Sequence, residues 1–275
     1  MWLSKRSTVS DSIPHNFKLR RKLGQHFLVS DSIAQSLVRA AQIQNSDTVF
    51  EIGTGLGKVT EFAAREAGRV ITCDIDREVL TIAQKALLNH RNIVFVQGDA
   101  FKEPLRSTKF DVCLTSLPYS RSRGFIDWAS ERNGSFSRAI AIVQAEFASK
   151  LRALPGSKNY KAVSVIAQIS FDIEELFWVD RSNFRPRPRV DSKAIRLLSK
   201  DGGKASQLNP WERQVIYKLF SFRRKLVRTL RGESLRAGHG GVVFPTNLAT
   251  KRIEHLNPSE FLSIIQALRG EGSNE

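Results

Sequence analysis

Residues 47–60 read DTVFEIGTGLGKVT, and this stretch decides the fold. The apolar run before Gly53 has the length of a short buried strand. Gly53, Gly55 and Gly57 follow it at every second position, which suits a tight turn and a close backbone approach to a ligand. Residues 58–67 then continue as a helix. The stretch therefore predicts a strand, a glycine turn and a helix, which together are one unit of an α/β sheet.

Strands and helices alternate on both sides of this stretch. Residues 31–43 place Ile33, Ala34, Leu37, Val38 and Ala41 at helical spacing, with Asp31 or Ser32 as the cap. Further strands are expected at 69–76, 92–100, 110–116, 139–143, 162–180 and 193–198, and further helices at 77–88 and within 144–154. Such alternation predicts a mostly parallel sheet with helices on both faces.

The run KDGGK at 200–204 breaks this pattern. Residues 208–232 and 246–269 beyond it read as helical and show no strand alternation. We therefore expect a basic N-terminal arm at 1–22, an α/β domain at 23–200 and a small helical domain at 205–275. The arm holds six Lys/Arg and one acid, which favours an RNA-contacting arm over an organelle transit peptide.

The charge of the chain indicates a polyanionic partner. Lys and Arg number 43 against 27 Asp and Glu, a net charge of +16. Such a surplus favours nucleic acid, with an anionic membrane surface as the alternative. No apolar run approaches the roughly 20 residues of a membrane span. Cys73 and Cys113 lie in apolar strands, which indicates buried free thiols in a reducing compartment, and the histidines lack the spacing of a zinc site.

Polar residues follow the predicted strands and point to one crevice. In open α/β sheets, ligands bind beyond the carboxyl ends of the strands. Asp74 and Asp76 close the second strand and Asp99 follows the third, where Asp74 suits a ribose, Asp99 an adenine amine and Asp76 a helix cap. Two acids and a glycine turn without a phosphate-binding lysine favour S-adenosylmethionine. A nicotinamide cofactor would require the spacing G-x-G-x-x-G, and a zinc deaminase would require the motif H-x-E…P-C-x-x-C. The sequence contains neither at these positions, so both classes are excluded.

Six motifs together resemble one protein family. They are GQHFL at 24–28, EIGTGLG at 51–57, DID at 74–76, GDA at 98–100, SLPY at 116–119 and FRPRPRVDS at 184–192. This set resembles the ribosomal-RNA adenine N6-dimethyltransferases, which are the dimethyladenosine transferases of the small subunit, with the macrolide-resistance methyltransferases as close kin. The resemblance extends to 220–225 and 252–261. It implies a Rossmann-like class I methyltransferase fold with a small helical C-terminal domain.

The resemblance also implies roles for individual residues. His26 and Leu28 would flank the methionine end of S-adenosylmethionine, and the glycine turn would approach the cofactor through its backbone. Tyr119 and Phe184 would sandwich a flipped target adenine. The implied cofactor-binding residues are His26, Leu28, Gly53, Gly55, Asp74, Asp99 and Ser116. The implied catalytic residues are Ser116, Leu117, Pro118, Tyr119 and Phe184, and no metal is implied.

Ser116 departs from the family pattern, which has asparagine at this position. The family places one side-chain acceptor and one backbone carbonyl against the hydrogens of adenine N6, which favours pyramidal geometry and stabilises developing charge. A serine hydroxyl can accept but reaches less far than an amide, while Leu117 still offers its carbonyl. The number of methyl groups transferred is therefore left open.

Basic residues close to the motifs indicate RNA contacts. Arg185 and Arg187 adjoin Phe184, where they can meet phosphates. The helical domain adds Arg223, Arg224, Lys225 and Arg228, with Phe222, Leu226 and Leu230 interleaved as a core stripe. We interpret the basic face as a clamp on the RNA backbone, in preference to a merely solvated face.

The sequence therefore predicts an S-adenosylmethionine-dependent N6-dimethyltransferase that acts on adenosines of a small-subunit rRNA hairpin, as free RNA or within an assembly intermediate. Large-subunit rRNA is the alternative substrate. The alternative from another class is an RNA- or DNA-binding assembly or transcription factor with reduced or lost catalysis, as Ser116 would suggest. We expect a cytoplasmic monomer that binds no membrane, or an organellar one if the N-terminus is a transit peptide.

Overall fold

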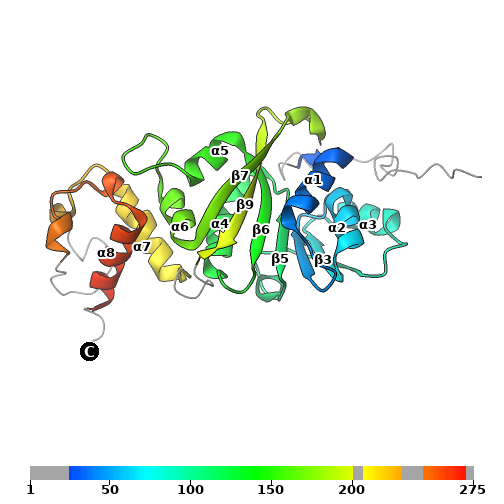
Figure 1. The fold of residues 1–275 in the computed structure, drawn as a ribbon, viewed down its shortest axis with the longest axis horizontal. Coiled ribbons are helices and arrows are strands. Elements are labelled where there is room, and N and C mark those ends of the chain that lie inside the picture. Colours follow the sequence, from blue (N-terminus) through cyan, green and yellow to red (C-terminus); the bar gives the residue numbers. More distant parts are fainter. Residues whose placement is uncertain (1–24, 201–206, 231–243, 271–275) are drawn as a thin grey trace, which may run out of the picture. The chain divides into compact units, whose positions relative to one another are not determined.

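A computed structural model of the chain describes residues 25–200, 207–230 and 244–270 (Figure 1). The predicted arm at 1–22 lies outside these ranges. Contacts divide the chain into two compact units: unit 1 comprises 1–125, 135–145 and 174–198, and unit 2 comprises 126–134, 146–173 and 199–275. This division differs from the single boundary near residue 200 that the sequence predicts, because residues 146–173 group with the C-terminal residues.

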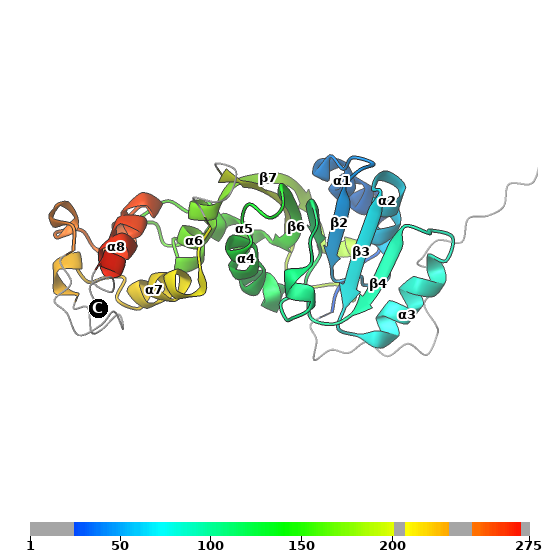
Figure 2. The same ribbon diagram turned by 90° about the horizontal axis from the view of Figure 1, so that it is seen from below.

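Unit 1 is built on a seven-stranded sheet with the order β4-β3-β2-β5-β6-β9-β7 (Figure 2). Its strands are β2 (Thr48–Ile52), β3 (Arg69–Asp74), β4 (Ile93–Gln97), β5 (Val112–Thr115), β6 (Arg138–Gln144), β7 (Phe171–Val179) and β9 (Ser192–Ser199). β2 to β6 pair in parallel, and β9 runs antiparallel to β6. A separate antiparallel pair joins β1 (Phe27–Leu28) to β8 (Phe184–Arg185). The predicted mostly parallel sheet is confirmed.

The helices are α1 (Asp31–Ala41), α2 (Lys58–Glu66), α3 (Arg77–Ala86), α4 (Ser122–Glu131), α5 (Ala145–Leu151), α6 (Ala162–Ser170), α7 (Pro210–Ser221) and α8 (Pro258–Gly270). The apolar stripe of α1 packs with α2 against one face of the sheet, where Val49, Val70 and Leu114 are fully buried. Ser30 caps α1 by accepting from the Ile33 amide, so the predicted caps Asp31 and Ser32 are wrong. No helix within the described ranges is long and apolar enough to cross a membrane.

Residues 162–170 form α6, although the sequence predicts a strand there. Nearly every side chain of this helix is buried, so the apolar run shows no amphipathic period that would distinguish it from a core strand. Its first turn is fixed by the hydroxyl of Ser164, which accepts from the Lys161 amide at 2.9 Å. The chain becomes a strand only at Phe171.

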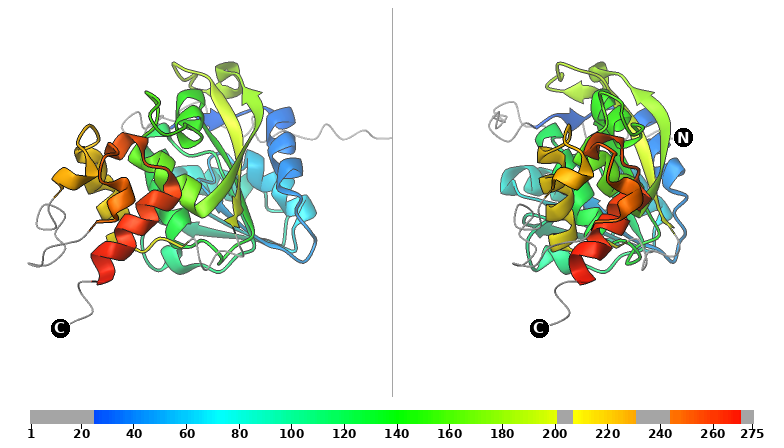
Figure 3. Two further views of the ribbon diagram at one scale, coloured as in Figure 1. Left: turned by 60° about the vertical axis from the view of Figure 1, so that its left-hand side comes forward. Right: turned by 90° about the vertical axis from the view of Figure 1, so that its left-hand side faces the viewer.

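Unit 2 is helical, and α7 and α8 lie side by side within it (Figure 3). Phe220 of α7 stacks on Phe261 of α8 at 5.5 Å between ring centroids. α7 ends at Ser221 rather than near 232, because the following segment pairs with 249–253, for example through Val227 N–H and the Lys251 carbonyl at 2.9 Å. Without a helix, Phe222, Leu226 and Leu230 form no continuous stripe. Leu230 is buried, but its buried neighbour is Val227, whereas Phe222 and Leu226 are half-buried.

Candidate active site

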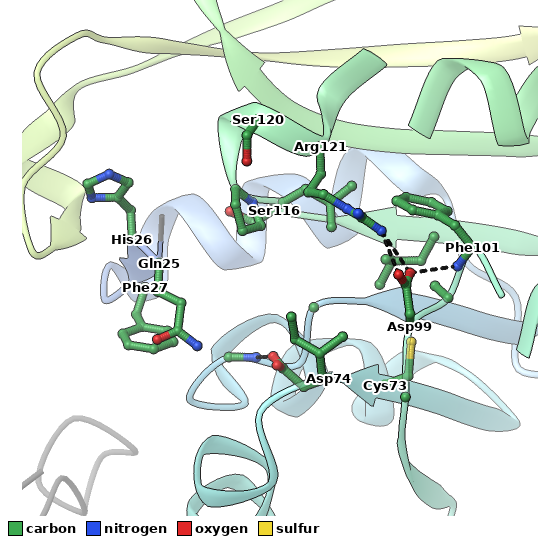
Figure 4. Close-up of a pocket in the computed structure, with 18 residues that line it drawn as sticks. Gln25, His26, Phe27, Cys73, Asp74, Asp99, Phe101, Ser116, Ser120 and Arg121 are labelled. Atoms are coloured by element: carbon green, nitrogen blue, oxygen red, sulfur yellow. Dashed lines mark hydrogen bonds and ion pairs between the residues drawn. The ribbon is translucent and has the colours of Figure 1, made fainter. Parts of the chain in front are cut away.

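A pocket of about 270 Å³ lies at the carboxyl ends of four neighbouring parallel strands (Figure 4). Gly53 follows β2, Asp74 ends β3, Asp99 follows β4 and Ser116 follows β5, and all four line the pocket. The sheet therefore brings together the polar residues that the sequence predicts at its strand ends.

The glycine turn after β2 requires its glycines for conformational reasons. Gly53 has φ +87° and Gly55 has φ +51°, a left-handed region that residues with a Cβ rarely adopt. The Gly53 amide donates to the Cys73 carbonyl at 2.9 Å, and the Gly55 amide donates to Asp74 Oδ2 at 3.1 Å. Two hydrogen bonds therefore hold the glycine turn against the end of β3.

Asp74 and Asp76 play different parts at the end of β3. Asp74 lines the pocket, and burial raises the pKa of its carboxyl above the ordinary value while hydrogen bonds from the amides of Asp76 and Gly55 oppose the rise. Asp76 is 1% exposed and caps α3 by accepting from the Glu78 amide, as the sequence predicts. Asp74 is therefore the carboxylate that a ligand can reach.

Gln25 is a pocket residue that the sequence analysis missed. Its amide nitrogen donates to Asp76 Oδ2 at 3.2 Å, which turns the side chain toward the pocket. Its Oε1 is buried and has no hydrogen-bond partner within the part of the chain that the structure describes. The signal was present, because Gln25 belongs to the GQHFL motif. A buried acceptor without a partner favours a ligand that brings a donor.

Asp99 is paired with a residue that the sequence analysis did not single out. Arg121 Nη2 lies 2.8 Å from both Asp99 oxygens, and the Phe101 amide donates to Asp99 Oδ1 at 3.0 Å. The guanidinium also lies over the Phe101 ring, 4.9 Å from its centroid. Residues 99 and 121 are far apart in the sequence, so no local pattern indicates this contact. It forms because the loops after β4 and β5 lie next to each other.

The turn that follows β5 holds Tyr119 in a fixed orientation. Its hydroxyl lies 2.7 Å from the hydroxyl of the buried Ser192, and its ring stacks on His26 with centroids 5.8 Å apart. His26 Nδ1 lies 2.7 Å from the Pro186 carbonyl, so this nitrogen carries the proton. Burial raises the pKa of the Tyr119 hydroxyl, with Asp191 adding to the rise. His26 lines the pocket, and Tyr119 stands beside it rather than in its lining.

The structure contradicts the predicted position of Phe184. Its side chain is 2% exposed, belongs to a hydrophobic core cluster of unit 1 and does not line the pocket. Phe184 pairs with Leu28 across the β1–β8 ladder, so both side chains are directed into the core. A ring in the core offers no free face to a base. Leu28 borders only a small recess of about 40 Å³ beside the pocket.

Glu51 lies in the interior directly behind the pocket. The hydroxyls of Thr60 and Thr72 donate to its Oε2 at 2.5 and 2.6 Å. Burial nevertheless raises the pKa of the Glu51 carboxyl from 4.5 to about 7, because removal from water costs the charged form more than these hydrogen bonds return. Glu51 also borders the small recess, together with Ser116.

The predicted phosphate-contacting cations are exposed with one exception. Arg185 and Arg187 of unit 1 are exposed, and Arg187 lies 3.9 Å from Asp180. In unit 2, Arg224, Lys225 and Arg228 are exposed, whereas Arg223 pairs with Glu254 at 3.0 Å and is half-buried. Arg223 therefore has less freedom to meet a phosphate.

The chemistry of the pocket suits a ligand with hydroxyl and amino donors. Its polar groups include the carboxylates of Asp74 and Asp99, and apolar side chains supply much of the remaining lining. Arg121, the basic side chain among the lining residues, is occupied by Asp99. A nucleoside that carries a positive charge and no phosphates fits these residues.

Comparison with known proteins adds independent findings. A family model described as ribosomal RNA adenine dimethylase matches residues 16–269. A probable ribosomal RNA small subunit methyltransferase A of Thermococcus sibiricus is 34% identical over 212 residues, or 77% of this chain and 75% of the relative. The ribosomal RNA small subunit methyltransferase A of Levilactobacillus brevis is 30% identical over 272 residues, or 92% of this chain and 91% of the relative.

Solved structures confirm the fold class. A dimethyladenosine transferase of Plasmodium falciparum matches with a TM-score of 0.75 and 26% identity, covering 90% of this chain and 98% of that one. The 23S rRNA methyltransferase ErmE matches with a TM-score of 0.59 and 22% identity, covering 88% and 99%. The latter likeness concerns the fold alone.

Proposed function

The chain belongs to the ribosomal RNA adenine dimethylase family, and we propose that it transfers methyl groups from S-adenosylmethionine to N6 of adenosines in small-subunit ribosomal RNA. The observation that carries the proposal is the pocket itself. Acceptors for a nucleoside stand at the ends of β3 and β4, next to the Ser116–Tyr119 turn. The small-subunit relatives support the choice of RNA.

Several pocket residues would hold the cofactor, which supplies an electrophilic methyl group when bound. Asp74 would accept from the ribose hydroxyls, and Asp99 from the adenine amine. His26 and Ser116 also line the pocket, and the target base would enter beside them.

Ser116 and Leu117 would accept hydrogen bonds from N6 of the target adenine. The Ser116 hydroxyl has no hydrogen-bond partner among the described residues, so it is available to a ligand. Two acceptors on N6 draw its hydrogens out of the ring plane and localise the lone pair on nitrogen. The proton that N6 loses then goes to solvent, because a hydroxyl or a backbone carbonyl accepts a hydrogen bond but is too weakly basic to keep a proton.

Tyr119 would be the stacking surface for the flipped base. Its ring is fixed by Ser192 and His26, so little side-chain entropy is lost when a base stacks on it. The proposal rests on Tyr119 alone, since Phe184 is in the core. Base–aromatic stacking contributes about 1–3 kcal/mol, which helps offset the cost of unstacking the base.

The exposed cations would bind the RNA backbone. Arg185 and Arg187 in unit 1, and Arg224, Lys225 and Arg228 in unit 2, supply sequence-independent affinity. Shape and phosphate contacts then position a structured RNA, and the flipped adenine provides identity. The protein would act as a cytoplasmic monomer, on free RNA or on an assembly intermediate.

Transfer of labelled methyl groups tests the proposal. Purified protein is incubated with S-adenosylmethionine labelled in its methyl group and with unmethylated small or large ribosomal subunits, and the RNA is digested to nucleosides. We expect labelled N6-methylated adenosines from small subunits. If label appeared only in large-subunit RNA, that RNA would be the substrate instead. If the protein bound RNA but transferred no label, the assembly-factor alternative would be supported.

Substitution at Ser116 separates the acceptor role from a structural one. Ser116→Asn should preserve or raise turnover, because it restores a longer acceptor, whereas Ser116→Ala should lower kcat with little change in cofactor affinity. A complete loss of activity in Ser116→Asn would show that position 116 does not correspond to the asparagine of the family pattern.

A further inference from the structure

Arg121 closes the adenine end of the pocket in the structure. It reaches Asp99 from the side of the pocket that carries Ser116 and Ser120 (Figure 4). Its Nη2 lies 2.8 Å from both Asp99 oxygens and so occupies the middle of the carboxylate edge. Asp99 Oδ1 also accepts from the Phe101 amide at 3.0 Å, which leaves that oxygen with two donors. An adenine amine that takes the carboxylate edge held by Arg121 therefore competes with this side chain.

The contact between Arg121 and Asp99 can be exchanged for another. The two side chains are 45% and 22% exposed, and ion pairs with this much exposure are weak. Arg121 is otherwise held by the face of Phe101, which constrains the guanidinium without occupying its donors. An incoming donor on Asp99 would thus release Arg121 at small cost.

Arg121 stands on the same turn as the proposed base platform. Its backbone amide donates to the Pro118 carbonyl at 2.8 Å, so Tyr119–Arg121 form a single turn of 3-10 helix. A nucleotide whose base stacked on Tyr119 would place its phosphates near this turn, because the base and its phosphate belong to one nucleotide. A guanidinium matches a phosphate in geometry and charge, so a released Arg121 has a second partner within reach.

We propose that Arg121 couples cofactor binding to RNA binding by exchanging Asp99 for an RNA phosphate. The inference rests on the proposed function and adds a residue that the function does not require. When adenine takes Asp99, Arg121 turns to the RNA. Because coupling between two ligands is reciprocal, RNA that holds Arg121 frees Asp99 and raises the affinity for the cofactor.

Calorimetric titration of S-adenosylhomocysteine tests the coupling, with and without saturating RNA from unmethylated small subunits. The wild-type protein should bind S-adenosylhomocysteine more tightly in the presence of RNA, by up to about fivefold, the range of an exposed ion pair. In the absence of RNA, the Arg121→Ala variant should bind S-adenosylhomocysteine more tightly than the wild type does. Addition of RNA should then change the affinity of the variant only slightly. Arg123→Ala, which removes an equal charge two residues away, should retain the wild-type effect of RNA.

Two results would overturn the inference while leaving the proposed function intact. Weaker binding of S-adenosylhomocysteine by Arg121→Ala in the absence of RNA would make Arg121 a part of the adenine site. An equal effect of RNA on the wild type and on Arg121→Ala would show that coupling does not pass through this residue. If the wild type bound no S-adenosylhomocysteine, the proposed function would fail and the inference with it.

Discussion

Replacing Glu51 by glutamine should stabilise the protein above neutral pH. The Glu51 side chain is 2% exposed, and burial raises its pKa from 4.5 to about 7. In the unfolded chain the same carboxyl is in water and titrates at its ordinary value. The folded protein therefore holds a proton on Glu51 over a pH range in which the unfolded chain has lost it.

The sign and size of the effect follow from this difference. Below about pH 4.5 the carboxyl is protonated in both states and costs nothing. As the pH rises from 4.5 to about 7, ionisation favours the unfolded chain, and above that range the cost is constant at about 3 kcal/mol. Glutamine removes the charge, and its amide oxygen can accept from Thr60 and Thr72 in the same way. Residue 51 also borders the 40 Å³ recess, where a water molecule would accept from the new amide hydrogens.

Scanning calorimetry at pH 4.5 and pH 8, without ligands, measures this effect. At pH 8 the Glu51→Gln variant should melt about 6–12 °C above the wild type, given about 2–4 °C per kcal/mol for domains of this size. At pH 4.5 the two proteins should melt together. Glu66→Gln, an equal change on the exposed side of α2, should differ little from the wild type at either pH. A Glu51→Gln variant that melts with the wild type at pH 8 would refute the reasoning.

Three further predictions concern binding and catalysis. Asp99→Ala should weaken S-adenosylhomocysteine binding by about 10- to 150-fold, the range for a hydrogen bond to a charged group, and unchanged calorimetric affinity would contradict the role of Asp99. Tyr119→Ala should lower kcat/KM for methyl transfer by about 5- to 150-fold, whereas Tyr119→Phe, which loses only the bond to Ser192, should retain most activity; equal losses would exclude a stacking role. Joint replacement of Lys225 and Arg228 by alanine should reduce the slope of log affinity against log salt by about 1.4–1.8 between about 50 and 200 mM, and an unchanged slope would place this face away from RNA.

The parts of the site that follow strand ends could be predicted from the sequence. In a parallel sheet the carboxyl ends of adjacent strands meet at one edge. Residues that follow these strands in the sequence are therefore expected to lie close together, and this holds for Gly53, Asp74, Asp99 and Ser116. The cap at Asp76 was equally predictable, because a helix begins directly after it.

Other features depend on tertiary contacts that no local pattern records. The apolar residues of α6 are buried on all sides, so their spacing cannot separate helix from strand. Phe184 is flanked by exposed arginines, yet its place opposite Leu28 directs it into the core. Arg121 meets Asp99 only because the loops after β4 and β5 adjoin, and a long side chain reaches from one to the other.

The β1–β8 pair has a consequence for biosynthesis. Residues 25–28 emerge from the ribosome early, but their partner strand at 184–185 and the hydroxyl at Ser192 are made more than 150 residues later. Until then Phe27 and Leu28 have no strand to pair with, and the Tyr119 hydroxyl has no hydrogen bond to Ser192. A nascent polypeptide can thus complete its glycine turn and early strands long before it gains a finished cavity, so translation itself delays the moment at which the enzyme first becomes competent.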